Sequence, residues 1–171
     1  MGKSFETSFS SQRGESMKIA QILFLALALP LLVHSAHGTP PTTVSGFIAG
    51  TSFTFTSIFF ADNNTIYTVT VTTLLTGALT GSGVDYATLV VHRDGSFNAQ
   101  HLSTCSCTFA GRSGTLNSIF NLKGSMVTRV AIGRWTILSG TGDLALLHGQ
   151  GTLNGAPFVG ANYSLEVHFQ P

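Results

Sequence analysis

Two cysteines and a histidine on one extended segment are the residues whose type and spacing could do chemistry. Cys105 and Cys107 are the only cysteines of the chain, and His101 precedes them at the same alternating position. In a regular strand such positions share one face, and residues i and i+2 have Cα atoms about 6.6 Å apart, near the upper limit for a disulfide. Three alternatives stay open: a strained disulfide, two free inward thiols, or a metal or redox site.

His101 is expected to face the interior together with Phe97 and Phe109, which have the same parity on this segment. There it is either a hydrogen-bonded core residue or an acid or base in a pocket. A structural zinc site needs four ligands, and the sequence around the histidine and the two cysteines shows no fourth. We therefore predict no metal and no cofactor.

The usual catalytic signatures are missing from the sequence. It has no Ser-His-Asp ordering, no HExxH motif, no phosphate-binding loop and no dinucleotide fingerprint. The motifs therefore leave open whether the protein is an enzyme.

The composition excludes some classes of partner. Of 171 residues, 9% are charged and 43% are hydrophobic, and the formal net charge is +1. A disordered polyelectrolyte or a nucleic-acid-binding protein would need many more charges, in the second case basic ones. The length fits a single domain, and we predict no nucleic-acid partner.

The first 38 residues are typical of an extension followed by a secretory signal peptide. Met17 and Lys18 precede an apolar run, Ile19–Val33, and small residues follow it up to Gly38. The run is interrupted by Pro30 and is shorter than the roughly 20 residues that span a bilayer. We therefore expect a secreted or periplasmic protein, a domain over residues 39–171, and no membrane association after cleavage. Translation could start at Met1 or at Met17.

The remainder of the chain has the two-residue period of half-buried strands. The first segment places Phe53, Phe55, Ser57 and Phe59 on one face. The second places Tyr67, Val69, Val71 and Thr73 on one face. Six further strands are predicted, over Asp85–His92, Ser96–Phe109, Gly114–Leu122, Met126–Leu138, Asp143–Leu147 and Ala161–Phe169.

Glycine-rich turns between these segments indicate antiparallel neighbours. We predict an all-β fold, an eight-stranded antiparallel β-barrel. A Greek-key sandwich is the alternative, and closure is favoured because few charges are available to protect open sheet edges.

Several short motifs occur in an order and spacing that resemble a known family. They are Thr76–Gly83, Tyr86, His92–Ser96, Phe109–Thr115, Gly133–Ile137, Ser139–Leu144, Leu147–Gly151 and Tyr163–Val167. The series is similar to a family of functionally uncharacterised domains in the allene oxide cyclase barrel-like superfamily, with dirigent proteins as more distant relatives. The resemblance implies the eight-stranded barrel and no particular activity.

The interior of such a barrel is the expected functional site. Our leading hypothesis is a small, largely apolar ligand, held by Tyr86, His101, Trp135 and Tyr163 in a cavity of at least about 300 Å³. One alternative, suggested by the resemblance, is an isomerase or cyclase, or a dirigent-like stereo-directing protein, acting on an oxylipin or phenolic intermediate. Another is a structural module that binds a second protein. The charge-poor exterior also makes a homo-oligomer plausible.

Overall fold

The computed structural model describes residues 38–170, which form one compact unit of eight strands. The predicted signal peptide lies outside the described residues, apart from its last position. Within the described part, no helix has the length and hydrophobicity needed to cross a membrane. The strands are β1 (Thr42–Ala61), β2 (Asn64–Gly77), β3 (Leu79–Val91), β4 (Ser96–Phe109), β5 (Arg112–Ser125), β6 (Val130–Gly140), β7 (Leu147–Ala156) and β8 (Gly160–Phe169).

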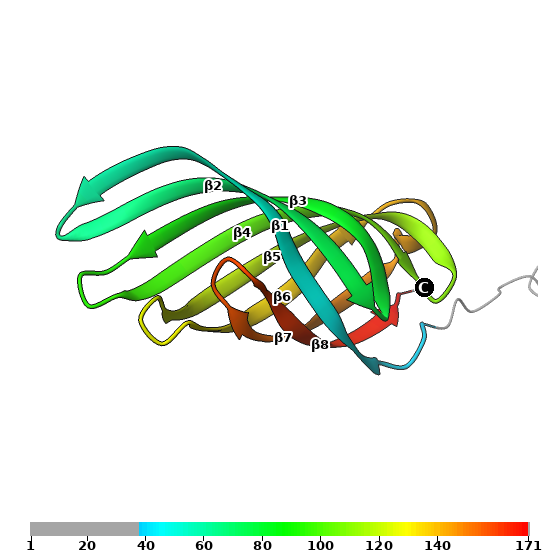
Figure 1. Ribbon diagram of the computed structural model, residues 1–171. Helices are drawn as coiled ribbons and strands as arrows, with labels where there is room; N and C mark the ends of the chain where they lie inside the picture. Colours follow the sequence, from blue (N-terminus) through cyan, green and yellow to red (C-terminus); the bar gives the residue numbers. More distant parts are fainter. Residues whose placement is uncertain (1–37, 171) are drawn as a thin grey trace, which may run out of the picture. The chain divides into compact units, whose positions relative to one another are not determined.

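Each strand pairs antiparallel with the next, and β8 pairs with β1, so that the sheet closes into a ring (Figure 1). Short turns permit this because antiparallel neighbours need only a few connecting residues. Between β3 and β4 the chain reverses over His92–Gly95, where Gly95 alone has a positive φ, +80°. The all-β fold with eight antiparallel strands is confirmed.

Two predicted strand positions are wrong. The segment Asp143–Leu147 is mostly not a strand, because Gly142–Leu144 forms a 3-10 turn, η2, and β7 begins only at Leu147. This turn begins at Gly142, whose φ of +59° ends the extended run. The sixth strand begins at Val130 and not at Met126, since Met126 lies in the preceding turn.

The predicted face of β1 is also wrong at its far end. The pairing of β1 with β2 shifts between Phe55 and Ser57, which is the mark of a β-bulge. Phe55 pairs with Val69, an inward residue, whereas Phe59 pairs with Ile66, which has the opposite parity. The extra residue therefore puts Phe59 on the outer face, away from Phe53 and Phe55.

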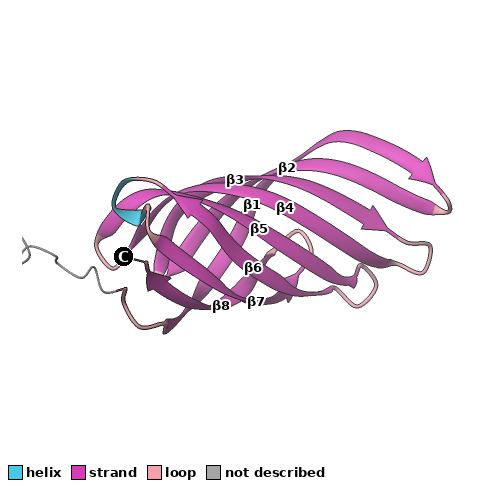
Figure 2. Cartoon of the chain, turned by 180° about the vertical axis from the view of Figure 1, so that it is seen from behind, coloured by secondary structure: helices cyan, strands magenta, loops and turns pink. Residues whose placement is uncertain are grey.

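One end of the ring is filled by an apolar cluster. The residues with at most 1% exposure are Leu79, Leu116, Leu144, Leu147 and Leu165. Leu144 comes from η2, which lies at the end opposite the β1–β2 turn (Figure 2). Through Leu144, η2 covers its own end of the ring. Any interior space must therefore lie toward the end with the β1–β2 turn.

Candidate functional site

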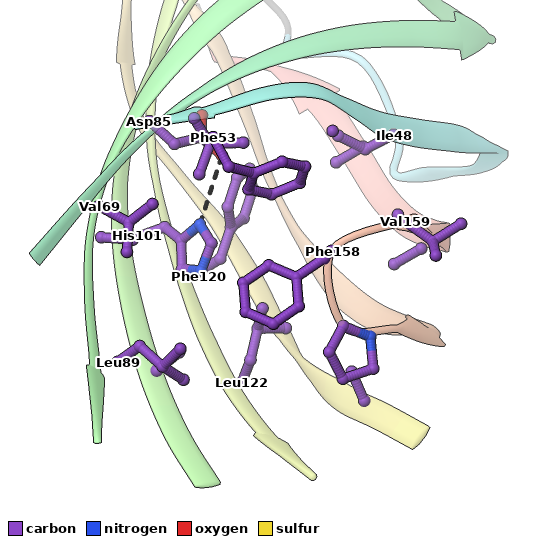
Figure 3. Close-up of a pocket in the computed structure, with 18 of the residues that line it drawn as sticks. Ile48, Phe53, Val69, Asp85, Leu89, His101, Phe120, Leu122, Phe158 and Val159 are labelled. Carbon is purple, nitrogen blue, oxygen red and sulfur yellow. Dashed lines mark hydrogen bonds and ion pairs between the residues drawn. The ribbon is translucent and has the colours of Figure 1, made fainter. Parts of the chain in front are cut away.

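A pocket lies inside the ring, and Figure 3 shows side chains that line it. Its lining includes Leu89 and Phe97, which flank the β3–β4 turn, so the pocket lies toward the end opposite η2. Its volume is about 120 Å³. Its walls are almost entirely apolar side chains that the two-residue period of β2 to β5 turns inward, among them Val69, Ala87, Leu89, Phe97, Phe120 and Leu122. The predicted volume of at least about 300 Å³ is wrong, because inward phenylalanine rings occupy much of the interior. An apolar cavity of about 150 Å³ is enough to hold benzene, so this space suits a molecule of about one ring.

The mouth of the pocket is bordered by the turn between β7 and β8. Phe158 packs edge-on against Phe53, with ring centroids 5.5 Å apart at 81° (Figure 3). The backbone N–H of Gly50 donates to the carbonyl of Val159 at 3.0 Å, which ties the turn to β1. Phe158 has a φ of +59°, a left-handed conformation that costs free energy in a residue with a side chain. The fold thus holds an aromatic ring over the pocket at the expense of local backbone strain.

The pocket is lined by three polar side chains, Thr73, Asp85 and His101, which we call its floor. Asp85 is the most deeply buried of the three. Asp85 is 2% exposed, and its register partner Ser103 on β4 and the next residue across, Ser118 on β5, are buried as well. The Oδ2 of Asp85 lies 3.4 Å from Nδ1 of His101, a long hydrogen bond. Oδ1 has no hydrogen-bond partner among the described residues. A buried carboxylate oxygen without a donor is costly, which makes it the clearest chemical signal inside the ring.

Replacing Asp85 with Asn should stabilise the protein without ligand. The substitution keeps the shape of the side chain and removes a buried charge, which we expect to raise the free energy of unfolding by about 1–2 kcal/mol. Chemical denaturation monitored by tryptophan fluorescence measures the change, with exposed Asp143→Asn as the control. A loss of stability in the Asp85 variant would contradict this prediction.

The four predicted ligand contacts divide between different places. His101 lines the pocket, with 18% of its side chain exposed. Trp135 and Tyr163 are each 2% exposed and pack edge-on against one another in the cluster near η2, so neither lines the pocket. Tyr86 is 64% exposed on the outer face, because its neighbours Asp85 and Ala87 face inward. The expectation that Tyr86 contacts an interior ligand is therefore wrong.

Tyr163 has a structural role. Its hydroxyl accepts a hydrogen bond of 2.9 Å from the backbone N–H of Leu79 and lies 3.3 Å from the carbonyl of Thr76. Burial raises the pKa of this phenol above 10.0, against the smaller opposing effect of backbone hydrogen bonds. The hydroxyl thus joins β8 to the β2–β3 turn, and the bond that it donates to Thr76 exists only while it is protonated.

Stability should therefore fall at high pH. Because the folded pKa of Tyr163 is raised, its contribution is complete below the unfolded value of 10.0 and is lost as the pH rises through the folded value. We expect the loss to approach about 1.4 kcal/mol per pH unit in this window. Denaturant unfolding at a series of pH values measures the slope, and Tyr163→Phe should flatten it. An equal slope in both proteins would rule out this assignment.

The sulfur atoms of Cys105 and Cys107 are paired in a disulfide, with Cα atoms 5.5 Å apart. Both residues face inward and are buried within the apolar cluster. Among the described residues no group of three or more histidine, cysteine or acidic side chains is arranged to hold a metal ion.

A second hollow, of about 380 Å³, lies on the outer surface over β6, β7 and β8. Its lining includes Arg134 and Glu166, both of which are exposed. Trp135 is the buried member of the lining, and its indole Nε1 has no hydrogen-bond partner among the described residues. The other polar side chains there are at least partly solvated, and neither charged one is buried.

Fold and site together define a closed antiparallel β-sheet protein with a small apolar pocket and a buried carboxylate. Residues 43–166 match the family described as "Protein of unknown function (DUF3224)". The chain belongs to this family.

A solved structure shows the same fold. It is a protein of unknown function from the DUF3224 family of Shewanella oneidensis MR-1, and it superposes with a TM-score of 0.60 at 14% sequence identity. The match covers 77% of this chain and 99% of that one. No curated protein matches the chain. These comparisons lend no support to the resemblance to allene oxide cyclases or dirigent proteins.

Proposed function

We propose that this protein binds one small, largely apolar molecule inside the ring, beneath Phe158. The observation that carries the proposal is the pocket itself: about 120 Å³ of space with apolar walls inside the ring. A void without partner atoms costs packing energy, and a ligand restores those contacts. Asp85 and His101 would also satisfy the requirement of the cyclase alternative for an ionisable group beside the cavity, but binding alone explains the apolar walls.

Titration with ethylbenzene tests the proposal. Burial of one aromatic ring should give a dissociation constant of roughly 1 mM or below. In two-dimensional amide NMR spectra, residues around the pocket such as Ala87 and Phe158 should shift and saturate. The absence of saturable shifts at the pocket would contradict the proposal.

A matched pair of variants locates the binding site. Ala87→Leu adds carbon atoms directly into the pocket and should abolish ethylbenzene binding. Thr88→Leu makes a similar change on the outer face of the same strand and should leave binding intact. Equal loss of affinity in both variants would indicate that the ligand binds elsewhere.

A different observation supports self-association through β1. Strand β8 covers β1 only along Thr42–Ala49, and one edge of Thr51–Ala61 has no strand partner among the described residues. This part projects beyond the ring as a hairpin with β2 (Figure 1). It contains no charged residue, and Phe59 and Phe60 are 59% and 81% exposed. Natural sheets usually protect such an edge, because its free N–H and C=O groups pair readily with another strand.

We propose that this free edge of β1 pairs with the same edge of β1 in a second copy of the protein. Every copy carries one free edge, and a two-fold axis would pair the two antiparallel and use both. Because the segment is uncharged, the pairing brings no like charges together. The full chain should therefore be a dimer by light scattering at micromolar concentration.

Lysine on the edge should dissociate that dimer. Phe60→Lys places a charge beside the free strand and is expected to give a monomer. Val127→Lys changes a similarly exposed residue, 75% accessible, in the β5–β6 turn and should remain dimeric. A monomeric wild-type protein, or a dimer that persists in Phe60→Lys, would overturn this proposal.

A further inference from the structure

We propose that the ligand of the interior pocket is a small apolar alcohol, whose hydroxyl donates a hydrogen bond to the carboxylate of Asp85. This inference rests on the proposed function, since it specifies the chemistry of the molecule that the pocket holds. It is carried by the unsatisfied oxygen at the pocket floor and by the uniformly apolar walls above it.

The carboxylate of Asp85 has an oxygen that needs a hydrogen-bond donor. Asp85 is the one charged residue that is buried among the described residues, and it lines the pocket. His101 occupies one carboxylate oxygen at 3.4 Å and leaves Oδ1 without a partner. Because rotation about the Cβ–Cγ bond of aspartate is soft, the carboxylate can present an oxygen to the cavity at little cost. A donor on the ligand would satisfy the oxygen that the protein leaves unpaired.

The apolar walls of the pocket disfavour ligands that carry more than one polar group. Only Thr73, Asp85 and His101 contribute polar side chains to the pocket lining, and they come from the adjacent strands β2, β3 and β4. A molecule with polar groups at both ends would have to bury one of them against leucine, valine and phenylalanine without a partner. The complementary ligand therefore has one donor at one end and hydrocarbon elsewhere.

A neutral hydroxyl fits this floor better than an ammonium group. An ammonium ion has three N–H donors and a large cost of removal from water, and the pocket offers it one free carboxylate oxygen. A hydroxyl has a single donor, which matches that one acceptor. Its bond to an ionised carboxylate is charge-assisted and about twice as strong as a bond between neutral groups.

Three molecules of the same size and shape test the inference: benzyl alcohol, ethylbenzene and benzylamine. Binding of each to the full-length protein is measured by NMR titration. We expect benzyl alcohol to bind about 10- to 100-fold more tightly than ethylbenzene, as a hydrogen bond to a charged group implies. Benzylamine should bind more weakly than the alcohol.

Two variants assign the preference to Asp85. In Asp85→Asn the charge is absent, and the advantage of benzyl alcohol over ethylbenzene should fall below about 3-fold. Asp143→Asn removes an exposed aspartate at the opposite end of the ring and should keep the full advantage. The comparison of the three ligands on the wild-type protein remains decisive even where the Asp85 variant does not fold.

The outcomes distinguish the alcohol inference from the proposed function on which it rests. Equal affinity for benzyl alcohol and ethylbenzene overturns the alcohol inference and leaves apolar binding intact. Tighter binding of benzylamine overturns it in favour of a cationic ligand. An unchanged alcohol preference in Asp85→Asn refutes the role of this carboxylate, whereas failure of all three molecules to bind contradicts the proposed function itself.

Discussion

Substitution of Gly46 by Ala is expected to lower the free energy of unfolding by about 3–5 kcal/mol. A β-carbon at this position would overlap both the carbonyl oxygen of Thr76 and the hydroxyl of Tyr163. These atoms hold the β2–β3 turn to β8, and the N–H of Leu79 depends on the same hydroxyl. The substitution therefore combines overpacking with the loss of buried hydrogen bonds.

Urea denaturation of Gly46→Ala measures this effect. Ser45→Ala changes the adjacent exposed residue of β1 and should alter stability by no more than about 0.5 kcal/mol. A loss of less than about 1 kcal/mol in Gly46→Ala would contradict this prediction, because it would show that Thr76 and Tyr163 can move away from β1 at little cost.

Truncation of Leu144 to Ala should cost about 2–5 kcal/mol, the range for a fully buried leucine. Leu144 is 0% exposed and comes from η2, whose other residues contribute little to the core. It packs in the apolar cluster with residues of β5 and β7, and its loss leaves a hole at the covered end of the ring.

Leu146, two residues further along, is the matched control. It is 50% exposed, so Leu146→Ala removes the same atoms from a largely solvated site and should cost about 1 kcal/mol at most. The two variants are compared by thermal unfolding under identical conditions. Similar losses in both would mean that η2 does not seal the ring.

The periodicity of the sequence predicts much of the sheet because inward and outward side chains alternate strictly in most strands. β4 begins and ends at the predicted residues Ser96 and Phe109, and β8 begins one residue earlier than predicted. The alternation fails for β7, whose glycines at positions 149 and 151 leave few side chains to show a pattern. It also fails in β1, since a bulge inserts a residue that no local sequence feature marks.

The candidate site was harder to predict from the sequence. The inward position of His101 follows from parity, and the same argument applied to Ala87 and Leu89 places Asp85 on the inner face. Tyr86 is among the predicted ligand contacts, although the alternation with Asp85 and Ala87 requires it to face outward. Sequence spacing does not specify how side chains from different strands pack. It therefore could not predict that Trp135 and Tyr163 lie in the apolar cluster, or that aromatic rings reduce the volume of the pocket.

A crystal structure of the protein soaked with benzyl alcohol tests the central claim most directly. We predict the aromatic ring among Val69, Ala87 and Phe120, below Phe158, with the hydroxyl within hydrogen-bond distance of the Asp85 carboxylate. An interior that stays empty at saturating alcohol, while the ligand occupies only outer-surface sites, would contradict an internal binding pocket.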